Sequence, residues 1–527
     1  MTKRILWLCL PLALGSARTS FAQDATDALR YSQLQFGGSA RTLSIGGANV
    51  ALGADYGSVS SNPAGLGLYQ KSEIQLTPGV GIGSGEGMLV NPNPGTTLNQ
   101  TTSALSQTAN SFHLSGGAVF SGRRNRANSE SNWKGGAFAI GFTRVADFNT
   151  GSDYQGTLLD NRSLFQRLRE YNTPLVGTGN GSLVDQSQNG YYNLDGLAFG
   201  TYLTDTASVV RNRTRQYSLL TQNRRGLITQ GEQVKNSGSM SQFDLAYGGS
   251  YRDRLYIGVG LGIVTSNFRS RRAFTELESD ASTPFTNYTL YDEVQTSGAG
   301  VNARLGLIYR VVDAVRIGAS VQTPTWMHLT DTYSSTIDSH FDASGNFPAE
   351  DYEATTGTNQ YAYTITTPFR ANGGVAVTVG KYGFLTGDIE YVGYQHMRLD
   401  SDPSNTLGDN ASFATDNANI ARDYGNAINL RFGGEARLDI FRVRLGFARY
   451  GSPYSSATVN TSYTNLAQNY YTGGLGLRQG NFFVDVAGVY TRYNTYYSPY
   501  AILDGTQPVV QVQNSRFTTT VTAGLTF

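Results

Sequence analysis

Apolar and polar side chains alternate along the last residues of the chain, 516–527. The apolar side holds Phe517, Val521, Ala523, Leu525 and Phe527, and the other side holds Arg516, Thr518, Thr520, Thr522, Gly524 and Thr526. A strand with one apolar and one small, polar face suits a barrel that crosses a membrane. A half-buried strand of a soluble sandwich would alternate in the same way. A terminal aromatic residue such as Phe527 is typical of bacterial outer-membrane barrels, so we interpret Phe527 as an insertion signal for the barrel-assembly machinery.

The same period of two recurs in fourteen segments that are bounded by turn residues. The pattern is clear at Ile257 and Val259, which face away from Gly258 and Gly260. The predicted strands are 73–82, 111–121, 135–146, 237–251, 253–269, 290–311, 313–333, 359–380, 382–399, 425–438, 441–455, 466–479, 481–497 and 511–527.

Short and long connections alternate between these segments. Short links lie near 252, 312–313, 381, 439–440 and 479–480, and a mid-sized one at 122–134. Long links lie at 83–110, 147–236, 270–289, 334–358, 400–424, 456–465 and 498–510. Outer-membrane barrels have tight turns at one rim and long loops at the other. The sequence therefore predicts an all-β fold, an antiparallel transmembrane barrel of about 14 strands over 73–527.

The long link at 147–236 exceeds the length of a plain loop. Leu159, Leu164, Phe165 and Leu168 recur at helical spacing, and so do Leu194, Leu197, Ala198 and Tyr202. We expect two short amphipathic helices on the outer side of the membrane. Their apolar faces either pack on each other and cap the barrel, or form an exposed groove that captures apolar molecules. The candidates for such capture are Phe165, Leu168, Leu197 and Tyr202.

The first residues have the features of an export signal. Lys3 and Arg4 precede the apolar run 5–14, and 20–22 is a small-residue cleavage site, so we predict a signal peptide over 1–22. The run is too short for a spanning helix, and no later stretch reaches the roughly 18 apolar residues needed. Cys9, the only cysteine, lies in this leader. The mature chain is therefore expected to lack disulfides and thiol chemistry.

The charge balance argues against nucleic acid as a partner. The signal segment holds three basic residues and no acidic one, so its removal lowers the 40 basic residues to 37, against 39 acidic ones. Such a chain carries no basic footprint. The 62 glycines, the 33 tyrosines and a charged fraction of only 15% suit a barrel, because its apolar band is spread over alternate residues.

Residues 23–72 show no strand pattern. Small-residue helices and glycine turns are expected there, which suits a compact plug, or hatch, inside the lumen. The candidate hatch and gating residues are Gly46, Gly47, Asn62, Pro63, Ala64 and Gly65.

Several short motifs follow one another along the chain. They are Gly46-Gly-Ala-x-Val-Ala51, Asn62-Pro-Ala-Gly65, Arg144-Val-Ala-Asp-Phe148, Gly298-x-Gly300-x-Asn302, Asp313-x-x-Arg316-x-Gly318-Ala319 and Arg431-x-Gly433-x-Glu435. In these motifs and their order the chain resembles the FadL/TodX-type outer-membrane transporters of long-chain fatty acids and aromatic hydrocarbons. The resemblance implies 14 strands around an N-terminal hatch that shifts when ligand binds, and lateral exit of the cargo through the wall. It also implies passive transport without nucleotide hydrolysis, but it does not transfer the identity of the cargo.

Charged residues fall on the polar face of the predicted strands. They are Asp244, Arg304, Asp388, Glu390, Arg431, Glu435, Arg437, Arg442, Arg444 and Asp485. Because a charge that faces lipid at mid-depth costs roughly 2–4 kcal/mol, these residues are expected to face the lumen. They either form a paired network between hatch and wall, or Arg431, Arg437 and Arg442 recognise a polar headgroup.

Two features could mark a lateral opening in the wall. Gly135, Gly136 and Gly141 could loosen the third strand, whereas Pro324 and Pro368 each remove a ladder hydrogen bond. The prolines could also mark only bulges near the rim.

The sequence offers little for catalysis. None of the four histidines has the i, i+4 spacing of a helical metal site, and neither a Gly-x-Ser-x-Gly nor a phosphate-binding Gly-Lys-Thr motif occurs. We expect no enzyme activity, no cofactor and no metal. The expected partners are hydrophobic small-molecule cargo, outer-membrane lipid and lipopolysaccharide. The alternatives are a general porin for polar solutes, which a plug argues against, and a surface adhesion barrel without a continuous apolar cavity.

Overall fold

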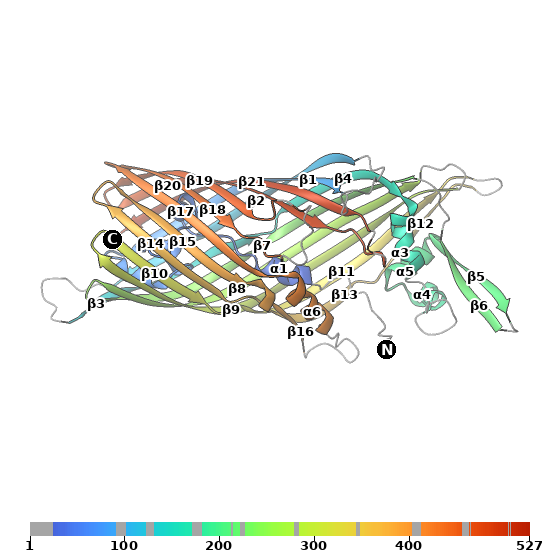
Figure 1. The fold of residues 1–527 in the computed structure, drawn as a ribbon, viewed down its shortest axis with the longest axis horizontal. Helices are drawn as coiled ribbons and strands as arrows, with labels where there is room; N and C mark the ends of the chain where they lie inside the picture. Colours follow the sequence, from blue (N-terminus) through green and yellow to red (C-terminus); the bar gives the residue numbers. More distant parts are fainter. Residues whose placement is uncertain are drawn as a thin grey trace, which may run out of the picture.

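The chain forms a closed antiparallel barrel of 14 strands, which confirms the predicted fold (Figure 1). The computed structural model describes residues 25–90, 102–122, 131–170, 182–211, 214–221, 227–278, 284–343, 348–402, 413–455, 463, 465–503, 505 and 507–527. The predicted signal peptide lies outside these residues. The barrel closes where β1 (Glu73–Val90) pairs with the last strand, β21 (Val509–Thr526).

The other strands follow around the wall in chain order. They are β2 (Thr102–Ser121), β3 (Trp133–Asp147), β4 (Thr150–Leu159), β7 (Leu227–Tyr251), β8 (Leu255–Glu278), β9 (Phe285–Val312), β10 (Val315–Gln322), β11 (Trp326–Phe341), β12 (Glu350–Thr355), β13 (Asn359–Thr366), β14 (Arg370–Val379), β15 (Gly383–Gly393), β16 (Arg398–Ser401), β17 (Asn426–Leu438), β18 (Phe441–Tyr450), β19 (Gln468–Gln479) and β20 (Phe482–Tyr497). Some wall strands are interrupted, so β3 with β4, β10 with β11, β12 with β13 and β14, and β15 with β16 each fill one position.

Every predicted segment coincides with one of these wall positions, but many strands are longer than predicted. The segment 73–82 is the start of β1, which continues to Val90, and 237–251 is the end of β7, which begins at Leu227. Beyond the apolar band neither face of a strand contacts lipid, so the alternation of apolar residues ends before the strand does. The sequence pattern therefore marks the membrane-facing part of each strand.

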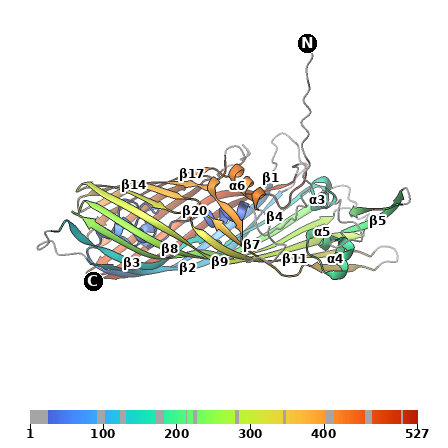
Figure 2. The same cartoon turned by 90° about the horizontal axis from the view of Figure 1, so that it is seen from below.

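The two rims of the barrel differ. At the rim that we call the short-turn end, tight turns join β7 to β8 and β17 to β18. The opposite rim, the long-loop end, carries the helices α3 (Leu164–Glu170), α4 (Leu183–Asn189) and α5 (Leu194–Gly200), and a separate hairpin of β5 (Thr204–Arg211) and β6 (Thr214–Thr221). Figure 2 shows these elements at the end opposite to the C-terminus. Helix α6 (Ala414–Asp423) and the 3-10 turns η4 (Asp160–Arg162) and η5 (Tyr394–His396) complete the connections.

The insertion predicted at 147–236 is shorter in the structure. Its first part is β4 and its last part is the start of β7, and these two strands pair with each other in the wall. The helices lie between them. None of the described helices is long and apolar enough to cross a membrane.

An apolar band surrounds the outside of the barrel. On β8, Ile257, Val259, Leu261 and Ile263 are 42–62% exposed, whereas the inward neighbour Tyr256 is fully buried. The same alternation occurs on the neighbouring β7 and β9. Exposed apolar area of this extent is stable only in contact with lipid, so the molecule is a transmembrane β-barrel.

Residues 25–72 fold inside the barrel (Figures 1 and 2). They form α1 (Ala25–Ser32), α2 (Ala40–Ser44), and the 3-10 helices η1 (Tyr56–Val59) and η2 (Pro63–Leu68). The side chains of Ser39, Asp55 and Asn62 accept hydrogen bonds from main-chain amides in the first turns of α2, η1 and η2. Because these side chains satisfy amides at the N-termini of the helical turns, the segment stays compact without joining the sheet.

Candidate functional site

The ladder between the second and third strands of the wall is interrupted. β2 pairs with β3 over 116–121 and with β4 over 102–105. Between these ladders, 106–115 of β2 have no ladder partner in β3 or β4, although they pair with β1 on the other side. We call this part of the wall the unpaired stretch.

The unpaired stretch begins beyond Phe142, the last residue of β3 that pairs with β2. It does not begin at Gly135 and Gly136, where the β3–β7 ladder has a register shift at Gly135 and Gly136 pairs with Gly249. Pro324 and Pro368 lie in the short interruptions of β10–β11 and β13–β14. There the Thr367 amide donates to the Thr325 carbonyl at 3.0 Å, and the ladder continues in the same register on both sides. The prolines therefore mark local interruptions in a wall that stays paired.

Arg516 of β21, which β1 and β2 separate from β3 in the wall, holds the bend between β3 and β4. Its Nη1 lies 3.2 Å from Oδ2 of Asp147, and its Nη2 donates to the Asn149 carbonyl. The Phe148 amide donates to the Gly238 carbonyl of β7 at 3.1 Å. The side chains of Arg516 and Asp147 are only 16% and 8% exposed. A mostly buried ion pair and main-chain hydrogen bonds thus fix the bend.

Glycines of β1 allow the bent segment to cross the inner face of the wall. A Cβ at Gly85 would lie 2.0 Å from the Gly151 carbonyl oxygen, and one at Gly87 would lie 2.6 Å from the Asp153 carbonyl oxygen. Side chains at either position would collide with β4, so only glycine permits this approach.

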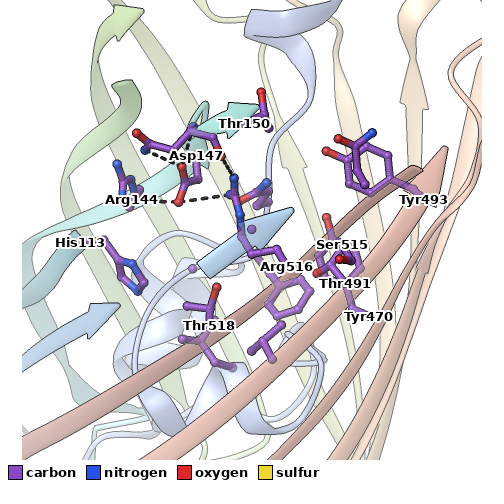
Figure 3. A pocket seen from close by; sticks show the side chains of 18 of the residues that line it. His113, Arg144, Asp147, Thr150, Tyr470, Thr491, Tyr493, Ser515, Arg516 and Thr518 are labelled. Carbon is purple, nitrogen blue, oxygen red and sulfur yellow. Dashed lines mark hydrogen bonds and ion pairs between the residues drawn. The ribbon is translucent and has the colours of Figure 1, made fainter. Parts of the chain in front are cut away.

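A pocket of about 100 Å³ lies beside the bend (Figure 3). Phe36 and Leu43 of the N-terminal segment and Val489 of β20 give it apolar walls, whereas Arg144 and Arg516 line it with guanidinium groups. A larger cavity of about 560 Å³ continues towards the long-loop end and shares lining residues with the pocket. The shared residues are Gln35, Asp147, Thr150, Gly151, Tyr493 and Asn514.

The polar side of the pocket carries more positive than negative charge. Asp147 lies between the two guanidiniums, 3.7 Å from Arg144 and 3.2 Å from Arg516. Arg144 also donates to the Phe112 carbonyl at 2.9 Å. One carboxylate thus faces two arginines beside an apolar wall, an arrangement that suits a molecule with an apolar body and a polar or anionic end.

Sequence reasoning missed this cluster as a site. Arg516 was visible on the inward face of the last strand, and Asp147 within the Arg144–Phe148 motif. Nothing in the sequence indicated that the two residues meet. Arg516 and the bend are far apart in the chain, with 367 positions between Arg516 and its partner Asn149, and they meet only because the barrel closes.

Gly46 and Gly47 of the predicted hatch both have a positive φ, of 67° and 74°. A Cβ at Gly46 would lie 2.9 Å from the Phe447 carbonyl oxygen of the wall, and one at Gly47 would lie 2.7 Å from Cβ of Phe36. Both positions therefore require glycine for backbone conformation as well as for space.

The Asn62–Gly65 turn binds the wall directly. The buried Asn62 amide donates to three carbonyl oxygens, those of Val50, Leu307 and Ala319, at 2.7, 3.2 and 3.3 Å. Its Oδ1 accepts from the Ala64 amide at 3.1 Å, and Pro63 occupies the first turn of η2, followed by Ala64 and Gly65. The structure thus places these four predicted hatch residues together against β9 and β10.

Further polar contacts join the N-terminal segment to the wall. The Asp388 carboxylate of β15 accepts from the amides of Asn49 at 2.7 Å and Val50 at 3.0 Å. The Tyr56 hydroxyl donates to the Gly116 carbonyl of β2 at 2.6 Å, and burial raises the pKa of this phenol. The hydroxyl is therefore retained as a neutral donor.

The predicted lumen charges are mostly paired. Nη2 of Arg431 lies 2.5 Å from Glu390, and Glu435 lies 2.7 Å from Arg444, 2.9 Å from Arg437 and 3.5 Å from Arg41 of the N-terminal segment. Arg442 donates to the carbonyls of Asp439 and Phe441. Burial alone would lower the pKa of Arg41, but Glu435 and Asp55 hold it above its ordinary value. These contacts fit the hypothesis of a network between hatch and wall; headgroup recognition by Arg431 or Arg437 would require breaking an ion pair.

The candidate capture residues lie in the helices at the long-loop end. Phe165, Leu168 and Leu197 are at most 1% exposed in one apolar cluster, whereas Tyr202 is 54% exposed. A pocket of about 160 Å³ adjoins the cluster, between Leu164, Leu194 and Tyr500. The helices therefore cap the barrel in this structure. Ligand capture stays a prediction and requires the cluster to open.

Phe527 ends the chain at the closure of the barrel. Its amide donates to the Ser72 carbonyl at 2.9 Å and its main-chain oxygen accepts from the Ser72 amide at 3.0 Å, while 64% of the residue is exposed. An exposed terminal ring at the rim is compatible with the predicted role in insertion, which stays a prediction. Within the described part of the chain, no group of three or more His, Cys, Asp or Glu residues is placed to hold a metal.

Removing the charge of Asp388 is expected to loosen the N-terminal segment. Asp388→Asn removes the charge that accepts two hydrogen bonds, each worth about 1.5–3 kcal/mol. The new side chain also places an NH2 group, itself a donor, near the donating amides of Asn49 and Val50. Val50 is fully buried, so a Val50→Cys thiol should react faster with maleimide in the Asp388→Asn background. Asp313→Asn, at an exposed turn, is the matched control. Equal labelling rates in all backgrounds would show that Asp388 does not hold the segment.

Solved structures share this fold. A FadL homologue of Pseudomonas aeruginosa matches with a TM-score of 0.51 at 12% identity, covering 93% of this chain and 98% of that one. The toluene transporters TbuX of Ralstonia pickettii and TodX of P. putida match with TM-scores of 0.47 at 14% and 12% identity, each covering 93% of this chain and 99% of theirs. No family model and no curated protein matches the sequence.

The similarity to the FadL homologue extends over nearly the whole of both chains. The expected FadL-type fold, a barrel of 14 strands with an N-terminal segment in the lumen, is therefore confirmed. This is the architecture of a bacterial outer-membrane barrel.

Proposed function

We propose that the protein is a passive outer-membrane channel for hydrophobic or amphipathic small molecules, such as long-chain fatty acids or aromatic hydrocarbons. The long-loop end faces the outside of the cell and the short-turn end faces the periplasm. The observation that supports this best is the cavity of about 560 Å³ that leads to the pocket beside the unpaired stretch. Each CH2 group that leaves water there gains about 0.8 kcal/mol, so an alkyl chain enters without an energy source.

The proposed exit is lateral, between β2 and the bend. The N-terminal segment fills the lumen between the pocket and the short-turn end, so the straight path along the barrel axis is blocked. No ladder hydrogen bond joins 106–115 of β2 to the bend, so a molecule that passes between them has to break only the bonds from Arg144 to the Phe112 carbonyl and to the Ser115 hydroxyl. Towards the short-turn end the outer face of this stretch is apolar, with Phe112 and Leu114 66% and 38% exposed, and there it offers the departing molecule a lipid environment.

The N-terminal segment is the proposed gate, because it touches both the pocket and the bend. The Gln35 amide donates to the Val145 carbonyl at 2.7 Å, and a Cβ at Gly37 would lie 2.5 Å from the Arg144 carbonyl oxygen. Phe36, between them, lines the pocket. A ligand that displaces Phe36 must therefore also move its neighbours against the bend, which couples occupancy to the width of the exit.

Uptake into liposomes tests the proposal. Reconstituted protein should admit a fatty acid or an alkylbenzene and exclude a small sugar, because the apolar walls of the pocket favour the first two and the plug blocks the third. Protein-free liposomes give the background rate of each solute. Free sugar flux through the intact protein would favour a general porin, and absence of flux for every solute would favour an adhesion barrel or an enzyme.

A further inference from the structure

Two arginines lie on the outer surface of the barrel, beside the apolar band and on its long-loop side. Arg449 of β18 and Arg492 of β20 are exposed, and Asn469 of β19 lies between them. The ladders pair Arg449 with Asn469 and Asn469 with Arg492. Neighbouring strands lie about 4.8 Å apart, so the three side chains form one row with the arginine positions about 10 Å apart.

An aromatic row marks the depth of these residues in the membrane. Phe447, Tyr471 and Tyr490 are paired in the same way, two residues closer to the short-turn end on each strand. The rings of Phe447 and Tyr471 lie 5.4 Å apart, and Tyr471 and Tyr490 are 56% and 40% exposed. Aromatic rows of this kind lie at the boundary between hydrocarbon and headgroups. The arginines are therefore at the level of the lipid headgroups.

Neither arginine forms an ion pair with any residue that the structure describes. Outward arginines on another face of the barrel do: Arg269 and Arg271 of β8 both contact Glu293 of β9. The row also continues without charge, through Ser515 of β21 and Ser84 of β1. Two guanidiniums with an amide between them thus form a local positive charge that no acidic side chain in the described part of the chain neutralises.

The wall is low at this place. β18 ends at Tyr450 and β19 begins at Gln468, directly beyond the row, whereas β7, β8 and β9 have 25, 24 and 28 residues. Neither β18 nor β19 therefore extends beyond the row to cover a headgroup above Arg449 and Asn469.

We propose that Arg449, Asn469 and Arg492 bind the phosphates of a phosphorylated glycolipid of the outer leaflet, of the lipid A type. Guanidinium groups form paired, charge-assisted hydrogen bonds with phosphate, and the Asn469 amide supplies a further donor. The acyl chains lie along Tyr471, Tyr490 and the outward apolar residues closer to the short-turn end. The site rests on the orientation given under the proposed function, with the long-loop end outermost, but not on transport.

Native mass spectrometry of the whole protein, titrated with bis-phosphorylated lipid A, tests the site. The double variant Arg449→Gln/Arg492→Gln should bind about tenfold more weakly for each arginine removed. The matched control is Arg269→Gln/Arg271→Gln, which removes two outward arginines that Glu293 already neutralises, and it should bind like the unchanged protein. A difference in migration between unheated and heated samples in detergent gels verifies that each variant is folded.

Three further titrations identify the group that is recognised. The affinity of dephosphorylated lipid A for the unchanged protein should be no higher than the affinity of lipid A for the double variant. Inorganic pyrophosphate alone should bind weakly because it lacks acyl chains. Phosphatidylglycerol should be displaced by lipid A. Equal binding of lipid A to the double variant and the unchanged protein would overturn the proposal, and so would undiminished binding of the dephosphorylated lipid. Uptake in liposomes of phospholipid alone needs no glycolipid, so failure of the transport proposal would be seen separately.

Discussion

Deletion of residues 25–68 should convert the barrel into an open pore for polar solutes. The segment fills the lumen, and the wall groups that contact it are polar: Asp388, Arg316 and Ser320 all bind its main chain. Once it is removed, these groups line a hydrated bore. We expect a persistent single-channel conductance in planar bilayers and sugar flux into liposomes, both absent from the intact protein, together with loss of preference for apolar solutes.

A second deletion provides the control. Strands β5 (204–211) and β6 (214–221) form a separate hairpin at the long-loop end, so deletion of 204–221 leaves the lumen filled and should leave conductance unchanged. A folded barrel without 25–68 that still conducts no ions would contradict the assignment of this segment as the plug. It would show that wall side chains close the lumen by themselves.

Replacement of Arg516 by methionine should release the bend between β3 and β4. The change leaves the mostly buried Asp147 carboxylate without its closer guanidinium, and loss of one partner of a buried ion pair costs about 3 kcal/mol or more. It also removes the donor to the Asn149 carbonyl. We expect a lower free energy of unfolding in urea, and slower uptake of apolar solutes because the pocket and the unpaired stretch lose their fixed geometry.

Exchanging the two charges separates the ion pair from simple damage. Arg516→Asp combined with Asp147→Arg should recover part of the stability that either single change removes. Arg398→Gln is the control, because its pair with Asp400 is exposed and such pairs contribute little. Normal uptake in a folded Arg516→Met protein would show that transport does not depend on this bend.

The barrel could be predicted from the sequence because its pattern is local. A strand that faces lipid must place an apolar side chain at every second position, as Ile257, Val259 and Leu261 do, and loop lengths are read directly along the chain. The N-terminal segment was predictable for the converse reason: it lacks the period of two and is rich in glycine turns. Ends of strands beyond the membrane were not predictable, because their two faces are chemically alike there.

The candidate site could be predicted only in part. The Asn62–Gly65 turn and the inward charges were visible as residue types, and the hypothesis that helices 164–170 and 194–200 pack as a cap was available beside that of a capture groove. The partners were not visible. Arg516 meets Asp147, Arg41 meets Glu435, and Gly85 accommodates Gly151 only because distant strands become neighbours when the sheet closes.

The sequence by itself determined that this chain forms a membrane barrel with a separate N-terminal segment, since lipid imposes a rule on each strand independently. Only the tertiary structure decided where the wall is unpaired, which arginine holds the bend, and which apolar residues of the outer helices are buried. These properties depend on contacts between residues hundreds of positions apart, and register and closure of the whole sheet create them.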